Sequence, residues 1–347
     1  MNYSKISDSV VSQTRITIDN IQREYLKDSL PWSLAYSGGK DSSALLKLVY
    51  LALEELHRKS KLVTVIYCDT GVEIPIIRTF VIRTLENLSN EAVENNIPIR
   101  TRIVYPPIKD RFFSKVIGRG YPPPTFKFRW CTDVLRIRPI RRFLKNQNEQ
   151  CIVLLGVRKG ESFERDRIIS RHETTHDYYY RQSGNKNALI YSPIIGYNVS
   201  DVWSILNEES NPRSIDTEKL QILYSVLNSE NANSLKSSNV SGAKGRFGCW
   251  TCTVVRRDKA VENLIQNGEK SLESLFEFRN WLAEIRYDTS YRLKTRRNGN
   301  KGIGPFTVEA RKEILSRLLK AQCNTTWNLI TDEEIEYIRG QWLLDSQ

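Results

Sequence analysis

The sequence has few cysteines and lacks any long apolar run. Only six of its 347 residues are cysteine, and no stretch approaches the roughly 18 consecutive apolar residues of a membrane-spanning helix. Residues 1–19 are polar and mixed in charge, without the apolar centre of a signal peptide. We therefore expect a cytoplasmic protein that does not interact with membranes and forms no structural disulfides.

Two common nucleotide-binding patterns are also absent, namely the G-x-x-x-x-G-K-S/T of a Walker loop and the pattern G-x-G-x-x-G. A different glycine pattern is present instead. Residues 37–43 read Ser-Gly-Gly-Lys-Asp-Ser-Ser, after the apolar stretch 32–36 and before the apolar run 44–56. This order predicts a strand, a glycine turn and the N-terminus of a helix.

Such an arrangement is typical of a phosphate-binding site. Glycines let the backbone approach an anion closely, and the N–H groups and dipole of a helix N-terminus favour negative charge. Ser37, Ser42 and Ser43 can add hydroxyl donors, and Lys40 adds a positive charge. The alternative is an ordinary glycine turn that leads into a helix.

Apolar strands alternate with helices along the first half of the chain, which predicts an α/β fold with a parallel sheet covered by helices on both faces. We expect strands at 31–36, 62–67, 99–104 and 151–155, and helices at 8–27, 42–58, 75–96 and 132–146. We predict two parts, a nucleotide-binding domain over 1–205 and a mainly helical region over 206–347. We expect Ser200, Thr307 and the Thr331–Glu334 pair to cap helices.

Ligands of such sheets bind beyond the carboxyl ends of the strands. The glycine loop, Asp69 and residues 156–158 follow three of these ends, so we expect them to converge on one crevice. Asp69 would position Mg²⁺ or a ribose hydroxyl there, or would instead hydrogen-bond its own turn. Arg158 and Lys159 would contact phosphates, and their alternative is a solvent-facing loop.

A second candidate site is rich in sulfur. Cys249-Trp250-Thr251-Cys252 is a C-x-x-C pattern that can bind a metal through two thiolates, and Cys131 can supply a third. Three thiolates suit an iron–sulfur cluster with one open iron, whereas a zinc site or a redox pair is the competing interpretation. Cys68 and Cys151 are expected to be buried on strands.

The chain carries an excess of positive charge, with 52 Lys and Arg against 40 Asp and Glu, a formal net charge of +12. Clustered basic residues favour a polyanionic partner such as nucleic acid over the alternative of a solvated basic surface. The clusters comprise Arg136, Arg138, Arg141 and Arg142; Arg256 and Arg257; and Arg292, Lys294, Arg296, Arg297 and Lys301.

One further pattern is rejected as a site. Residues 172–176 read His-Glu-Thr-Thr-His, which matches the H-E-x-x-H of zinc proteases. That chemistry needs a helix that presents both imidazoles on one face, and the sequence around His172 and His176 shows no apolar helical stripe. We interpret the segment as a loop.

The glycine loop resembles the SGGxDS loop of PP-loop ATP pyrophosphatases, which cleave ATP to AMP and pyrophosphate. The resemblance extends over five motifs and is closest to the phosphoadenosine-phosphosulfate-reductase-like proteins, among them the DndC and SspD sulfurtransferases of DNA phosphorothioation. The motifs are 37–42, Asp69-Thr70-Gly71, Arg129-Trp130-Cys131-Thr132, 156–162 and 246–252.

The resemblance implies that sulfur replaces a non-bridging oxygen of the DNA backbone, as in DNA modification for restriction. It implies ATP bound by Ser37, Gly38, Gly39, Asp41 and Ser42. Beside it, the residues themselves suggest Mg²⁺, further ATP contacts from Ser43, Asp69, Gly156 and Arg158, and catalytic roles for Lys40, Asp41 and Arg158. The resemblance also implies a 4Fe–4S cluster on Cys131, Cys249 and Cys252. DNA, a cysteine desulfurase as sulfur donor and other phosphorothioation proteins are the expected partners.

The expected reaction begins with attack of a DNA phosphate oxygen on the α-phosphorus of ATP, and sulfur then displaces AMP. Three alternatives are kept. A sulfonucleotide reductase needs a redox cysteine near the C-terminus, and residues 332–347 contain none. A tRNA thiolase would modify a base, and a non-catalytic nucleic-acid-binding module would have no use for the loop.

Overall fold

The computed structural model describes residues 3–146, 150–160, 166–167, 170, 179–181, 188–228 and 247–345. Its centre is a six-stranded sheet in the order β3-β2-β1-β4-β6-β5. The first five strands in this order are parallel, and β5 pairs antiparallel with β6 at the edge. The expected parallel α/β sheet is confirmed. The strands span β1 Trp32–Tyr36, β2 Val63–Cys68, β3 Ile99–Val104, β4 Cys151–Leu155, β5 Tyr179–Arg181 and β6 Ala188–Tyr191.

Alternating side chains of the central strands supply two separate cores, because successive residues of a strand point to opposite faces. On β4, Ile152 and Leu154 belong to the large core, whereas Cys151 and Val153 belong to a smaller one on the other face. Both faces are therefore buried, and the strands read as continuous apolar runs. Cys151 is a buried strand residue, as the sequence predicts.

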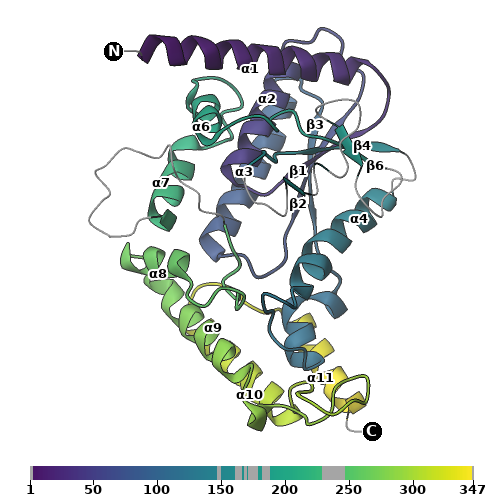
Figure 1. Ribbon diagram of the computed structural model, residues 1–347, viewed down its shortest axis with the longest axis vertical. Helices are drawn as coiled ribbons and strands as arrows, with labels where there is room; N and C mark the ends of the chain where they lie inside the picture. The colour runs from purple at the N-terminus through teal and green to yellow at the C-terminus, as the bar shows by residue number, and fades with distance from the viewer. Residues whose placement is uncertain are drawn as a thin grey trace.

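Helices cover both faces of the sheet (Figure 1). On one face α2 packs on β1 and α3 on β3, and α1 and α6 pack on α2. On the other face α4 packs on β2 and β3, with Ile140 and Leu144 in the smaller core. These helices span α1 Tyr3–Leu26, α2 Lys40–Glu54, α3 Pro75–Glu94, α4 Arg138–Lys145 and α6 Val199–Asn207. No helix of the described residues is both long and apolar enough to cross a membrane.

The rest of the described chain is mainly helical, as expected, and its helices α8–α11 lie beyond one end of the sheet (Figure 1). The large core contains residues from Ile18 to Ile338, so it includes residues on both sides of the division predicted at 205. That division stays a prediction. The helices span α7 Thr217–Asn228, α8 Lys259–Gln266, α9 Glu273–Ile285, α10 Val308–Cys323 and α11 Asp332–Asp345.

Thr307 caps α10 as predicted, by accepting a hydrogen bond from the N–H of Ala310. The prediction for α6 is wrong, because Asn198 is its N-cap and forms a capping box with Asp201, while the Ser200 hydroxyl only donates to Asn198. Before α11, Thr331 accepts from the N–H of Glu334, but the Glu334 carboxylate accepts from Ser114 instead of completing the box.

The helix predicted over 132–146 consists of two parts. Residues Thr132–Ile137 form a π-helix, and α4 continues from it as a regular α-helix. The wider turns of a π-helix often occur at functional sites. Here this segment directly follows Cys131 and carries Arg136, which faces the candidate site described next.

Candidate functional site

The glycine loop joins the end of β1 to the start of α2. Gly38 has a φ of +74°, and a Cβ there would lie 2.1 Å from the Val81 Cγ2 of α3, so the position accepts only glycine. The Ser42 hydroxyl donates to the carbonyl of Gly39 and accepts from the N–H of Ser37. The N-cap of α2 is Gly39, which has no side chain to cap the helix, and the Lys40 N–H donates to the Tyr224 hydroxyl at 3.2 Å.

A cavity of about 310 Å³ opens over this loop, and we call it the loop cavity. It lies at the carboxyl ends of β1, β2 and β4, where the topology predicts a ligand. Side chains from distant parts of the chain complete it, including Glu73, Arg136, Tyr224 and Phe247. Other lining residues are 35–37 at the end of β1, 39–42 of the glycine loop and the start of α2, 66–68 at the end of β2, and 155–157 at the end of β4.

Lys40, Asp41 and Arg158 form a buried ion triad at this loop. The Asp41 carboxylate accepts from Lys40 Nζ at 3.0 Å and from Arg158 Nε at 2.5 Å, and the three side chains are 5%, 15% and 6% exposed. The Lys40 ammonium also lies 5.2 Å from the ring centre of Tyr224. Two cations and one carboxylate leave a net positive charge beside the loop, which favours a bound phosphate.

Gly156 allows the end of β4 to touch the loop. A Cβ at this position would lie 2.6 Å from the carbonyl oxygen of Asp41 and 3.0 Å from the Cα of Ser42. Ser43 is placed differently from Ser42, because its side chain is fully buried and its hydroxyl lies 3.3 Å from that of Tyr36. Ser43 therefore contacts the core and is not part of the cavity lining.

Asp69 lines a second cavity of about 310 Å³ rather than the loop cavity. Its carboxylate accepts from the N–H of Gly71 at 2.9 Å and from Arg78 Nε at 2.8 Å. The side chain is thus engaged in its own turn and in an ion pair. Among the roles open to Asp69, the structure favours the turn over contact with a nucleotide in the loop cavity.

The three cysteines of the predicted cluster are close enough to affect one another's pKa. Burial is the main cause that raises the pKa of Cys249 to about 12; the charges of Glu73, Cys252 and Cys131 act in the same direction, and that of Arg136 opposes them. The pKa of Cys131 is also raised, first by burial and then by Cys252. Within the part of the chain that the structure describes, no three His, Cys, Asp or Glu side chains are close enough to hold a metal. The thiols suit an iron–sulfur cluster chemically, and the cluster stays a prediction.

Glu73 and Arg136 connect the sulfur site to the loop cavity, and both line that cavity. Arg136 Nη2 lies 3.8 Å from Glu73 and 3.9 Å from Cys249 Sγ. Residues 72–73 also pair with 249–250, through an antiparallel bridge from Glu73 to Cys249 and a hydrogen bond from the Trp250 N–H to Val72. Glu73 was not among the predicted site residues, although its position just after Asp69-Thr70-Gly71 is a signal.

Burial raises the pKa of Glu73, and the negative charge of Asp69 raises it as well. Glu73 accepts from the hydroxyl and N–H of Thr70, which favours its charged form. Arg292, predicted as part of a surface cluster, is instead buried and donates to the carbonyl of Gly304. Glu161, Ser162, His172, His176 and Arg246 lie outside the described residues.

Thiol reactivity tests the burial of Cys68, which lines the loop cavity at the end of β2. Burial raises its pKa to about 12, so almost no thiolate is present at pH 8, and only the thiolate is alkylated. We expect iodoacetamide to modify the exposed Cys323 first, and Cys68 slowly, at a rate that rises as the pH approaches 12. Peptide mass spectrometry measures both rates in metal-free protein, and equal rates at pH 8 would contradict the structure.

Comparisons with known proteins agree with the fold. The phosphoadenosine phosphosulfate reductase domain matches residues 31–254. An uncharacterized protein of Methanocaldococcus jannaschii is 30% identical over 220 residues, which are 61% of this chain and 40% of that protein. This chain thus spans less than half the length of the curated relative that it matches.

Two solved structures show distant likeness. The tRNA thiolase NcsA from Methanococcus maripaludis, solved with its 4Fe–4S cluster, has 13% identity and a TM-score of 0.39, with 80% of each chain covered. The FMN adenylyltransferase of Candida glabrata has 16% identity and a TM-score of 0.38, with 89% of this chain and 82% of that chain covered.

Proposed function

Since this chain belongs to the phosphoadenosine phosphosulfate reductase domain family, we propose that it uses ATP to activate a phosphate of DNA and then transfers sulfur to it. One observation carries the proposal. The loop cavity is lined both by the glycine loop and by Arg136, whose guanidinium lies 3.9 Å from Cys249 Sγ. This arrangement supports one site that uses both the glycine loop and the thiol of Cys249.

The chemistry needs an activation step because a DNA phosphodiester is a poor electrophile with no leaving group for sulfur to displace. In the first step a non-bridging oxygen of the DNA phosphate attacks the α-phosphorus of ATP, and pyrophosphate leaves. The product is a mixed anhydride of the DNA phosphate and AMP. The backbone N–H groups of the loop and the net positive charge of the Lys40–Asp41–Arg158 triad stabilise the departing pyrophosphate. Mg²⁺ would arrive with ATP and offset the remaining charge.

In the second step hydrosulfide attacks the activated phosphorus, its P–S bond forms, and the P–O bond to AMP breaks. A cysteine desulfurase is the proposed donor, and it carries the sulfur as a persulfide. Two thiols of excess cysteine reduce this persulfide by two electrons, forming cystine and releasing hydrosulfide, whose proton passes to solvent after the P–S bond forms. Cys131, Cys249 and Cys252 would hold a 4Fe–4S cluster, which supplies an iron atom at which sulfide can bind. The positive charge of Arg136 beside Cys249 lowers the repulsion between an anionic sulfur nucleophile and the phosphate.

The product of the reaction tests the proposal. The protein is incubated with ATP, DNA, a cysteine desulfurase and cysteine, and the DNA is digested and analysed by mass spectrometry. Sulfur in a nuclease-resistant dinucleotide is the expected result. Sulfur on a base would instead support a base thiolase. Formation of sulfite from a sulfonucleotide would support a reductase, and pyrophosphate release with no sulfur product would contradict the transfer step.

Iron analysis tests the cluster. We expect anaerobically purified protein to contain iron and acid-labile sulfide, and the Cys249→Ser variant to lose most of both, because one of three thiolate ligands is removed. Cys323→Ser is the matched control, since Cys323 is exposed at the end of α10. Zinc in place of iron, or unchanged iron in Cys249→Ser, would contradict the proposed cluster.

A further inference from the structure

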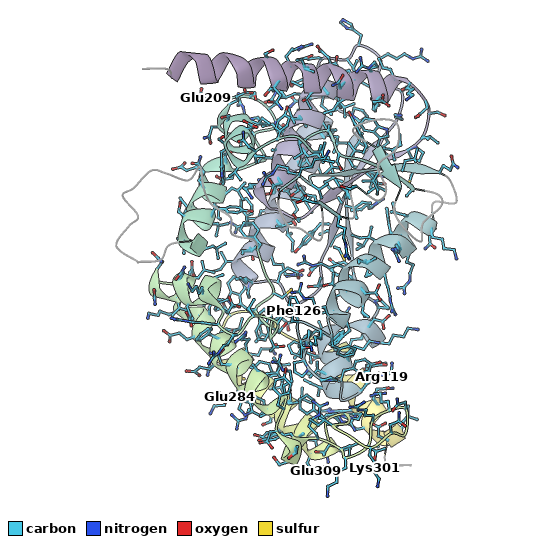
Figure 2. All side chains as sticks on the ribbon, viewed as in Figure 1. Arg119, Phe126, Glu209, Glu284, Lys301 and Glu309 are labelled. Carbon is cyan, nitrogen blue, oxygen red and sulfur yellow. The ribbon has the colours of Figure 1, made fainter. Side chains whose placement is uncertain are left out.

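Two phenylalanines point into solvent just before Cys131. Phe126 is 70% exposed and Phe128 is 47% exposed, although large aromatic side chains are usually buried. They belong to a tight turn, residues 125–129, which we call the aromatic turn. Its backbone closes through two hydrogen bonds between Thr125 and Phe128. Figure 2 labels Phe126 near the middle of the molecule, on the side of the C-terminal helices.

The aromatic turn is anchored to the rest of the protein on its N-terminal side. The carbonyl of Pro124 accepts from the Thr253 hydroxyl at 2.8 Å and from Arg286 Nη1 at 2.9 Å. Trp130 is buried on the other side of the turn and its Nε1 donates to Pro122. The exposed rings are therefore held in place before any ligand arrives, which lowers the entropic cost of binding.

The chain segment that holds the aromatic turn carries charges of one sign, although Lys115 pairs with Asp110 and Arg111 lies 3.8 Å from Glu334. No acidic residue occurs between Asp110 and Asp133, whereas five basic residues do. The Arg129 guanidinium lies 4.9 Å from the ring centre of Phe126, and Lys127 and Arg129 are both exposed. The five basic residues are Arg111, Lys115, Arg119, Lys127 and Arg129.

A second basic segment, residues 294–301, is joined to the chain that leads into this turn. Arg297 donates to the carbonyl of Arg119, and both guanidiniums lie over the ring of Tyr121, at 4.8 and 5.7 Å. Lys294, Arg296, Arg297 and Lys301 are exposed. Figure 2 shows Arg119 and Lys301 at the same end of the molecule. A second exposed basic segment thus contacts residues 119–121 of the chain that leads into the aromatic turn.

We propose that the aromatic turn binds single-stranded nucleic acid, with unpaired bases stacked on Phe126 and Phe128 and phosphates held by Lys127 and Arg129. The proposal rests on the proposed function and specifies the form of its substrate. A duplex presents its phosphates to a protein, and aromatic rings have no favourable interaction with phosphates. Unpaired bases, in contrast, can stack on aromatic rings. Alternation of aromatic and basic residues along one turn matches the alternation of bases and phosphates along a single strand.

The position of the turn links this surface to the sulfur site. Phe128 and Cys131 are three residues apart, so their Cα atoms lie within about 11 Å of each other, given roughly 3.6 Å per extended residue. The negative charge of Cys252 raises the pKa of Cys131. A strand stacked on the turn would therefore have a neighbouring phosphate close to the thiols.

Binding of labelled oligonucleotides tests the proposal. Fluorescence anisotropy gives the Kd of full-length protein for an oligothymidylate, an oligouridylate and a duplex of the same length. We expect Phe126→Ala to weaken binding of the single strands about tenfold, because stacking of one base is worth roughly 1–3 kcal/mol, and to change duplex binding by less than about twofold. Lys127→Gln should weaken both forms and reduce the salt dependence.

The controls separate folding, stacking and catalysis. Ile16→Ala removes an exposed apolar side chain, 56% exposed, from α1, which lies at the opposite end of the molecule from α11 (Figure 1). It should change neither binding nor thermal unfolding. ATP binding should be unchanged in Phe126→Ala, so that loss of strand binding is distinguished from failure of the nucleotide site.

Three results would overturn the proposal. They are wild-type protein that binds neither single strand, Phe126→Ala with unchanged single-strand binding, and Phe126→Ala with equal losses for duplex and single strands. Preference for the oligouridylate would support the stacking surface while contradicting DNA as the substrate of the proposed function.

Discussion

Replacement of Asp41 by asparagine is expected to abolish pyrophosphate release and to lower the free energy of unfolding by about 3 kcal/mol or more. Asp41 is the only carboxylate in the ion triad, and it contacts Lys40 Nζ at 3.0 Å and Arg158 Nε at 2.5 Å. The amide would deprive Lys40 and Arg158 of the carboxylate that they share. Their repulsion would displace Lys40 from the loop, where the pyrophosphate is to be held.

Two measurements check this prediction, namely pyrophosphate release with ATP and DNA, and unfolding followed by circular dichroism. Asp133→Asn is the matched control, because Asp133 pairs with Arg138 at 2.6 Å at the surface, where the two side chains are 44% and 55% exposed. An exposed pair contributes less than about 1 kcal/mol. Normal pyrophosphate release by Asp41→Asn would refute the proposed role of the triad.

Replacement of Gly156 by alanine is expected to reduce ATP binding and pyrophosphate release by about a hundredfold, because small misplacements in a site have effects of this size. The added Cβ would lie 2.6 Å from the carbonyl oxygen of Asp41, a backbone atom at the start of α2. Either the end of β4 or the loop must move. Overpacking of this kind costs about 1–3 kcal/mol of stability.

Gly196→Ala is the control for this change, since a Cβ at Gly196 meets no atom within 4 Å and its φ is not in the left-handed region. Calorimetry with a nonhydrolysable ATP analogue measures binding, and thermal unfolding measures stability. Wild-type affinity in Gly156→Ala would show that the loop does not depend on contact with β4, and ATP would then have to bind elsewhere.

The parts of the fold that follow from local patterns could be predicted from the sequence. The strands at 99–104 and 151–155 match the expected bounds, because residues 151–155 are a short apolar run and in 99–104 the β-branched Ile99, Thr101 and Ile103 alternate with other residues. The glycine loop was also predictable, since a left-handed φ at Gly38 and a close approach at Gly156 both require glycine. These features depend on a few neighbouring residues or on strand ends that any parallel sheet brings together.

Features that depend on distant partners could not be predicted. Glu334 fits a capping box locally, yet its carboxylate accepts from Ser114, which lies 220 positions away. Asp69 follows a strand end, but Arg78 on α3 binds its carboxylate and holds it in the second cavity. Ser43 is a different case, because the helical period alone turns it away from Ser42 and toward the core. That placement could have been found from the sequence.

The bridge between Glu73 and Cys249 couples the loop cavity to the sulfur site. The bridge joins the backbone of Glu73, a residue that lines the loop cavity, to the backbone of Cys249. Neither segment can therefore shift alone. Thermodynamic linkage then makes the effect mutual. If a bound nucleotide changes the affinity for sulfur or a cluster by some factor, bound sulfur or a bound cluster changes the affinity for the nucleotide by the same factor.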